Sequence, residues 1–155
     1  MKPQVFGSYT LLDRLGRGGM GEVFLARQHG HAGLERRVAI KRLSGRIAHS
    51  SSALANFADE ARIVALMNHA NIAQIYDFGE VSGQCYLAME YIHGRNLHEL
   101  LSRYRELGWT MPIQYACYTV MRVCEALDYA HNRSDYSGRP LDFVHRDISL
   151  GNLML

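Results

Sequence analysis

The order of hydrophobic and polar residues predicts strands in the first third of the chain and helices later on. Residues 5–43 contain three short apolar-rich runs, and the turn-like stretch "HGHAGLE" separates the second run from the third. Two further strands are predicted at 72–78 and 84–92. Helical spacing of apolar residues and capping signals predict helices at 50–68, near 96–106 and at 112–131.

The helix expected over 112–131 carries apolar residues on most of its faces. Pro112 suits its first turn. Cys117 and Cys124 are seven residues apart and share one face, so we expect both in a core. The stripe they belong to comprises Ile113, Cys117, Val120, Cys124, Leu127 and His131. Such a helix needs neighbours on several sides, and the 24 residues after it do not supply them. The pattern therefore favours a chain that is incomplete at its C-terminus.

Composition and charge restrict the class of protein. The 155 residues are 48% apolar and 21% charged, which is typical of a globular chain. The first 50 residues carry a net charge of +6 and the rest −4, so the basic third suits either an anionic ligand or a solvated surface. A total of +2 does not indicate nucleic acid or a membrane. Three cysteines without metal spacing, and no signal segment or long apolar run, favour a cytosolic chain with reduced thiols.

A glycine cluster links the first two predicted strands. Its spacing is Gly16-x-Gly18-x-x-Gly21, and the residues that follow, "EVFLA", alternate like a strand instead of opening a helix. Two strands with glycines between them form a hairpin flap, and glycine lets backbone amides approach a phosphate without obstruction. A plain glycine-rich hairpin explains the same residues about equally well.

One lysine stands out because the chain has fifteen arginines and only two lysines. Lys41 ends the apolar run "VAIK"; an edge lysine whose stem snorkels is the commoner case, but the arginine bias favours a position that needs a compact ammonium. Glu60 follows Phe57 by three residues, on the apolar face of its helix. A carboxylate on such a face needs a cation. We expect Lys41 to be the partner; pairing with Arg62, or solvation, is the alternative.

Near the end of the chain, His145-Arg146-Asp147 is followed five residues later by Asn152. Together with the glycine cluster, "VAIK", the helical Glu60 and "MEY", this order of motifs resembles that of protein kinases. The phrase "LGRGGMGEVFLA" is most similar to bacterial eukaryotic-like (Hanks-type) Ser/Thr kinases, and the resemblance extends from about Tyr9 to Leu155.

The resemblance implies an α+β, protein-kinase-like fold. Its β-rich N-lobe would be complete and carry one helix, and the first helices and the catalytic loop of the C-lobe would follow. The implied divisions are an N-terminal extension at 1–8, the N-lobe and hinge at 9–92, and an incomplete C-lobe at 93–155.

The same resemblance implies roles for single residues. Lys41 would hold the α- and β-phosphates of ATP and be fixed by Glu60, Asp147 would accept or orient the substrate hydroxyl, and Asn152 would bind one Mg²⁺. Glu90 and Ile92 would contact adenine through their backbones. The implied ATP-binding set is Leu15, Gly16, Arg17, Gly18, Gly19, Met20, Gly21, Val23, Ala39, Lys41, Met89, Glu90, Ile92, Asn96 and Met154.

The sequence departs from the family pattern at the catalytic loop. Ser149 stands two residues after Asp147, where Ser/Thr kinases usually have lysine, and Leu150 replaces the usual proline. The Ser/Thr assignment therefore rests on the N-terminal half. Asp77-Phe78-Gly79 looks like the magnesium-binding motif of kinases but precedes the catalytic loop, and we expect it to form a hairpin turn beside "EVSGQ".

These features favour the first part of a Ser/Thr kinase that uses ATP and Mg²⁺ and is inactive as an isolated 155-residue chain. The alternatives are a non-catalytic nucleotide-binding module, or an interaction protein that pairs with another chain through the helix at 112–131. Self-association through the incomplete C-lobe would be one form of such pairing. The protein substrate is unknown, nucleic acid is not expected, and a membrane tether beyond residue 155 stays open.

Overall fold

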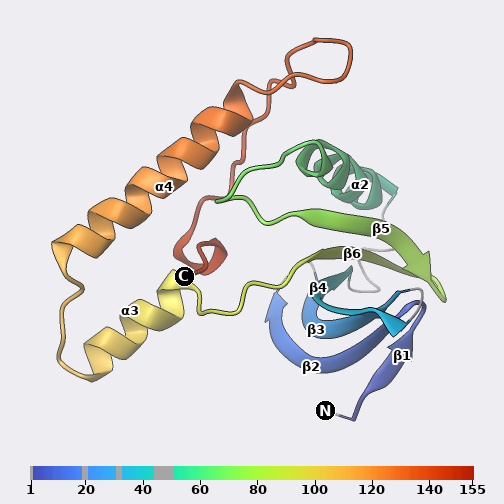
Figure 1. The fold of residues 1–155 in the computed structure, drawn as a ribbon, viewed down its shortest axis with the longest axis horizontal. Coiled ribbons are helices and arrows are strands. Elements are labelled where there is room, and N and C mark those ends of the chain that lie inside the picture. Colours follow the sequence, from blue (N-terminus) through green and yellow to red (C-terminus); the bar gives the residue numbers. More distant parts are fainter. Residues whose placement is uncertain (1, 19–20, 31–32, 44–50) are drawn as a thin grey trace. The chain divides into compact units, whose positions relative to one another are not determined.

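The computed structural model describes residues 2–18, 21–30, 33–43 and 51–155, without the side chains of 51–53, 56 and 60. The chain forms two compact units. The first comprises Met1–Leu66 and Ala73–Tyr91, and the second comprises Met67–Ile72 and Ile92–Leu155. The first unit contains a sheet and one helix, whereas helices and loops form the second (Figure 1).

The strands of the first unit form one antiparallel sheet. Six strands in the described chain take the order β1-β2-β3-β4-β6-β5, and β2, β3 and β4 curl strongly (Figure 1). Their bounds are β1 Gln4–Phe6, β2 Tyr9–Gly18, β3 Gly21–His29, β4 Glu35–Leu43, β5 Ile75–Val81 and β6 Gln84–Glu90. Since β1 pairs with β2, the segment before residue 9 adds a strand to this sheet.

Strand alternation gives the sheet two different faces. Val38 and Ile40 point to the core on one side, since successive side chains of a strand face opposite ways. This core contains Phe6, Tyr9, Leu11, Phe24, Ala26, Val38, Ile40, Tyr86 and Ala88. On the other side, Leu43 of β4 packs with Phe57 and Ala61 of helix α2 (Ser51–Ala65), which lies alongside β5 (Figure 1). β4 therefore packs into a core with one face and can present polar residues on the other.

Asp77 joins three strands of this unit. Its Oδ2 atom accepts hydrogen bonds from the hydroxyl of Tyr9 at 2.9 Å and from that of Tyr86 at 2.7 Å. The two phenol rings meet edge to face, with centroids 5.5 Å apart. Tyr9 is buried, so its hydroxyl needs this acceptor. The carboxylate is committed to holding β2, β5 and β6 together.

The expectation that Asp77-Phe78-Gly79 forms a hairpin turn is wrong. These residues lie inside β5, and the turn to β6 is made by Ser82 and Gly83 with φ of 51° and 76°. Two successive positive φ values match the twist of an antiparallel hairpin, and glycine supplies one of them without strain.

The second unit is built around two helices, α3 (Leu97–Glu106) and α4 (Ile113–His131), and the short 3₁₀ helix η2 (Leu150–Asn152). Asn96 caps α3, because its side chain accepts a hydrogen bond from the Glu99 backbone N–H at 2.8 Å. The Asn68 backbone N–H donates to the Tyr129 hydroxyl at 3.0 Å and fastens the segment at 67–72 to α4. Among the described residues, no helix is both long and apolar enough to cross a membrane.

The expectation that Cys117 and Cys124 lie in a core is wrong, since both are exposed. Ile113 and Val120, on the same stripe, are 68% and 61% exposed, and no segment of the described chain covers this face. The residues of α4 that are buried are Thr119 and Ala130. Spacing shows which residues share a face, and it does not show which face is covered.

Replacing Asp77 by Ala should lower the free energy of unfolding by about 2–4 kcal/mol, because two phenols lose a charged acceptor and Tyr9 stays buried. Urea denaturation measures the loss. Asp13→Ala is the control, because Asp13 is exposed and accepts a bond from the neighbouring Arg14 N–H. Equal losses in the two variants would contradict the role of Asp77.

Stability should decline at alkaline pH. Burial, and then the bond to Asp77, raise the pKa of Tyr86 from 10.0 to about 12. As pH rises, the Tyr86 hydroxyl loses its proton at a lower pH in the unfolded chain than in the folded chain. The stabilisation that this pKa difference contributes is therefore complete below pH 10 and is lost as pH rises toward 12. In urea melts at increasing pH, Tyr86→Phe should lose less stability than the parent chain. The decline that remains should come from Tyr9. Tyr136→Phe, at a residue that is 97% exposed, should leave the pH profile unchanged.

Candidate active site

The glycine cluster forms the expected hairpin between β2 and β3. Gly16 lies opposite Val23 and Gly18 lies opposite Gly21. Gly19 and Met20, which were expected to contact ATP, lie outside the described residues. A shift in the β2–β3 register between Arg14 and Gly16 leaves Leu15 without a partner in this pairing, and its side chain is 46% exposed. The β2–β3 pairing is therefore regular from Gly16 to Gly18 and irregular at Leu15.

The glycines of the hairpin are needed for different reasons. A Cβ atom on Gly21 would overlap the backbone oxygen of Arg42, and its φ of 153° is one that other residues rarely adopt. A Cβ atom on Gly16 or Gly18 would meet no described atom within 4 Å. Gly21 therefore allows β3 to approach β4 closely, whereas Gly16 and Gly18 leave their surroundings open, as a phosphate-binding flap requires.

The side chains expected around adenine and the phosphates share one face of the sheet. In register, Val23 lies opposite Lys41, and Ala39 lies opposite Met89. This is the face that α2 packs against, since Met89 contacts the cluster containing Leu43 and Phe57. The structure thus brings together Val23, Ala39, Lys41 and Met89, although Val23 and Met89 are 66 residues apart in the sequence.

Lys41 points toward helix α2. Its Nζ atom is 5.6 Å from the ring centroid of Phe57, which precedes Glu60 by three residues, about one helical turn. The Glu60 side chain lies outside the described part of the chain, so the pair with Lys41 stays a prediction. Lys41 is half-buried, which suits an ammonium held between the sheet and this helix.

At the end of β6, Glu90 is fixed by Gln74. The backbone N–H of Glu90 donates to the backbone oxygen of Gln74 at 2.8 Å. The Glu90 carboxylate accepts from the backbone N–H of Gln74 at 3.2 Å. Because its N–H is engaged, the backbone of Glu90 can contact a ligand only as a hydrogen-bond acceptor. In the second unit, the Ile92 oxygen accepts from the Gly94 N–H at 3.0 Å.

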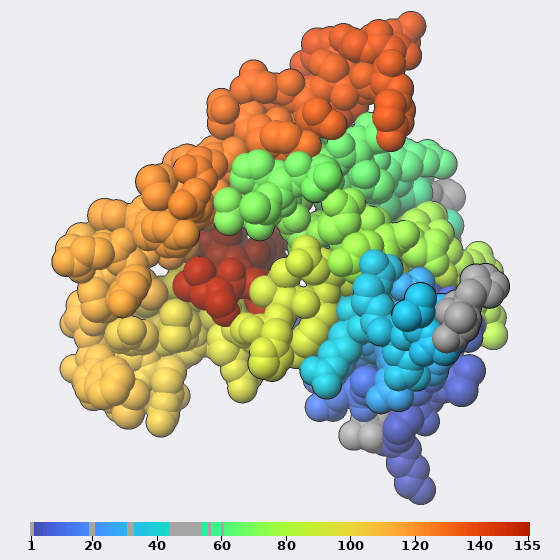
Figure 2. Space-filling view, viewed as in Figure 1, coloured from blue at the N-terminus to red at the C-terminus, as the bar shows by residue number. Residues whose placement is uncertain are grey.

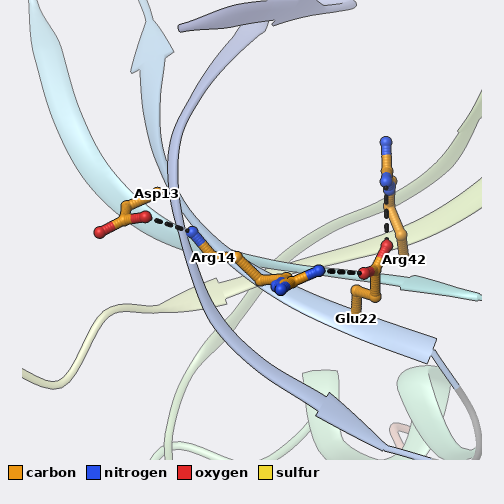
Figure 3. A network of polar contacts seen from close by, with 4 residues as sticks. All are labelled: Asp13, Arg14, Glu22 and Arg42. Atoms are coloured by element: carbon orange, nitrogen blue, oxygen red, sulfur yellow. Dashed lines mark hydrogen bonds and ion pairs between the residues drawn. The ribbon is translucent and has the colours of Figure 1, made fainter. Parts of the chain in front are cut away.

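Pattern reasoning missed Glu22, which follows Gly21. Its carboxylate binds Arg14 of β2 at 3.1 Å and Arg42 of β4 at 3.3 Å (Figure 3). The hydrogen bond from Arg14, helped by Arg42 and the nearby Arg17, holds the pKa of Glu22 below its usual range. The sequence offered one signal that could have pointed to Glu22, because it is one of only three acidic residues in the basic first 50 residues.

The segment that is expected to form the catalytic loop, in the second unit, closes on itself through Asn152. Its Nδ2 group donates to the backbone oxygen and to Oδ2 of Asp147, both at 2.9 Å. Arg146 adopts a φ of 61°, and the Asp147 N–H donates to His145 Nδ1 at 3.3 Å, so local bonds and a left-handed residue shape the turn. One amide thus orients the Asp147 carboxylate and presents its own Oδ1 on the opposite edge. Both side chains are exposed.

A short antiparallel ladder holds the end of this segment. Arg95 and Leu155 exchange two backbone hydrogen bonds of 2.9 Å, and Leu97 N–H donates to the Leu153 oxygen at 2.8 Å. Asn96 therefore lies opposite Met154, two residues that were expected to line the same nucleotide site. A side chain at Gly94 would overlap the Leu155 oxygen. Red and yellow atoms meet at this ladder in Figure 2.

The expected site residues form two groups, one in each unit. Within the described residues, no cluster of three or more His, Cys, Asp or Glu side chains could hold a metal ion. Asn152 offers an amide oxygen, which is a hard ligand that suits Mg²⁺ alongside phosphate oxygens and water. Asp77 is occupied by its two tyrosines and is not part of either group.

Comparison with known proteins identifies the class. The family model described as "Protein kinase domain" matches residues 9–155, so the chain belongs to the protein kinase domain family. The kinase domain of PknI from Mycobacterium tuberculosis is a similar solved structure, with a TM-score of 0.76 and 30% identity, covering 98% of this chain and 57% of that chain. This confirms the expected α+β, protein-kinase-like fold.

The curated relatives are bacterial kinases of two specificities. The chain is 36% identical over 152 residues to the tyrosine-protein kinase MasK of Myxococcus xanthus, covering 98% of this chain and 24% of MasK. It is 33% identical over 151 residues to the serine/threonine-protein kinase PknJ of M. tuberculosis, covering 97% of this chain and 23% of PknJ. The chain spans about a quarter of the length of these relatives.

The two kinds of glycine should separate in a stability measurement. Gly21→Ala should lower the free energy of unfolding by about 1–3 kcal/mol, because the added carbon overlaps Arg42 and the backbone conformation is strained. Gly18→Ala, the matched control, should change it by less than about 0.5 kcal/mol. Urea melts of both variants test this, and a Gly21→Ala curve that coincides with the parent would refute it.

Proposed function

We propose that this chain supplies the nucleotide-binding lobe and the catalytic loop of a protein kinase that transfers the γ-phosphate of ATP to protein hydroxyl groups. The N-lobe and hinge would comprise residues 9–92, and residues 93–155 would form part of the C-lobe. The observation that carries the proposal is the double hydrogen bond from Asn152 to Asp147. It orients an exposed carboxylate and leaves the amide oxygen of Asn152 on the opposite edge of the same side chain, an arrangement that suits a base near a metal ligand.

In the proposed reaction, Asp147 orients the substrate hydroxyl and accepts its proton. The hydroxyl oxygen forms a bond to the γ-phosphorus, the bond between that phosphorus and the β,γ-bridging oxygen breaks, and ADP leaves. Asn152 would hold Mg²⁺, which when bound neutralises phosphate charge. Lys41 would hold the α- and β-phosphates beneath the glycine hairpin, fixed by Glu60.

The shared face of the sheet supports the adenine contacts proposed for Val23, Ala39 and Met89. Val23 and Ala39 would cover the base from above, Met89 would lie at the back, and Met154 would form part of the floor. The carbonyl of Glu90 and the backbone of Ile92 would hydrogen-bond adenine, and Asn96 would lie near the ribose. Leu15, Arg17, Gly19 and Met20 would complete the flap over the nucleotide.

A tyrosine hydroxyl is a second candidate substrate, and Ser149 is the residue that favours it. Ser149 provides no cation two residues after Asp147, unlike the usual Ser/Thr pattern, and MasK, the relative with 36% identity, is named as a tyrosine kinase. The N-terminal motifs and relatives such as PknJ favour Ser/Thr. Both substrates use the same proposed chemistry at Asp147.

Asp147→Asn in the full-length protein should reduce phosphate transfer by about 10²–10⁴-fold, because the amide keeps the shape of the side chain but cannot accept the proton. Transfer from radiolabelled ATP to casein measures it. Glu106→Gln, at an exposed residue of α3 paired with Arg103, should retain full activity. Nucleotide binding by the parent without any transfer would favour the non-catalytic binding module.

Phosphoamino-acid analysis of the same reaction decides between the two substrate classes. Phosphoserine or phosphothreonine as the dominant product would support the Ser/Thr assignment, and phosphotyrosine would support the second candidate.

A further inference from the structure

We propose that Glu22 is a positioning residue for the phosphates of ATP, because it fixes the glycine hairpin to the strand that carries Lys41. This inference rests on the proposed function and adds to it a residue that does not itself touch the nucleotide. The observations concern the reverse side of the sheet, opposite the face that holds Val23 and Lys41.

The first step is the register of β3 and β4. Glu22 lies directly opposite Arg42, and the next pair along the same two strands is Val23 with Lys41. Since side chains alternate, the ion pair and the phosphate-side pair lie on opposite faces of adjacent rungs. The 3.3 Å contact between Glu22 Oε2 and Arg42 Nη2 therefore fixes the spacing of the two strands one residue away from Lys41.

The second step is the bond to a third strand. Glu22 Oε1 binds Arg14 Nη1 at 3.1 Å (Figure 3). Arg17 lies opposite Glu22 in the β2–β3 pairing. The register shift between Arg14 and Gly16 weakens the backbone ladder at this point, and Asp13 receives the Arg14 N–H at 2.8 Å. One carboxylate thus ties β2, β3 and β4 together where the ladder of backbone bonds is irregular.

The third step is the rigidity of the anchor. The Arg42 side chain is 17% exposed, and its guanidinium lies 4.5 Å from the ring centroid of Phe24 and 5.8 Å from that of Phe6. A guanidinium stacked on core rings is held more firmly than a surface cation. Glu22 is therefore attached to a fixed point of the core.

The flap itself has no comparable attachment among the described residues. No described atom lies within 4 Å of the Cβ positions of Gly16 and Gly18, so neighbouring side chains do not set their position. The clamp, Glu22 with Arg14 and Arg42, therefore holds together the strands that carry Gly16, Gly18 and Gly21. Positioning of this kind acts on the phosphates and leaves the adenine contacts of Ala39 and Met89 unaffected.

The test uses Glu22→Gln, which keeps the side-chain shape and removes the charge, in the full chain. The dissociation constants for ATP with Mg²⁺ and for adenosine are measured by calorimetric titration or competition. We expect ATP to bind about three- to tenfold more weakly, the scale of a good partly buried ion pair, and adenosine to bind within twofold of the parent. Arg14→Gln, which removes one arm of the clamp, should give a smaller loss for ATP alone.

The control is Glu35→Gln at the other end of the same two strands. Glu35 pairs with Arg27 at 3.3 Å and His29 at 3.5 Å, far along β4 from Lys41. Glu35→Gln should leave the affinity for ATP unchanged. If Glu35→Gln weakened ATP binding as Glu22→Gln does, the cause would be general loosening of the sheet, and the inference would be overturned.

Two further outcomes separate this inference from the proposed function. A parent chain that does not bind ATP with Mg²⁺ would overturn both. A parent that binds ATP, with a Glu22→Gln variant that binds ATP equally well or loses ATP and adenosine by the same factor, would overturn the positioning role and leave the proposed function intact.

Discussion

The alternation of side chains along β4 is the constraint on which the first unit depends. Val38 and Ile40 are completely buried on one face, and Ala39, Lys41 and Leu43 point the other way. The strand cannot shift by one residue, because that would bury Lys41 among the rings of the first core and expose Ile40. The same packing that stabilises the sheet therefore fixes the register of the lysine.

Much of this arrangement could be predicted from local sequence. The glycine hairpin and the strands and helices follow from periodicity and turn residues, which act over a few positions. The boundaries of α3 and α4 came within about a residue of expectation for the same reason. The motif order then indicated the family, which the match over residues 9–155 bears out.

The features that the sequence pattern did not predict depend on contacts between residues that are far apart in the chain. Asp77 sits 68 positions from Tyr9, and its place within β5 follows from the positive φ values of Ser82 and Gly83 further on. Glu22 reaches Arg42 because β3 and β4 pair in this register, and it reaches Arg14 because β2 pairs with β3. The exposure of Cys117 likewise depends on which segments cover α4, which helical spacing alone does not state.

The bonds between Asn152 and Asp147 have a consequence for how this segment can change during evolution. One amide touches both the backbone and the carboxylate of the residue it orients, so the two side chains act as a single mechanical part. Their substitutions should be strongly non-additive, with the second change costing little once the first is made. A substitution at either position therefore also changes the surroundings of the other, so evolutionary change in this segment would affect both residues at once.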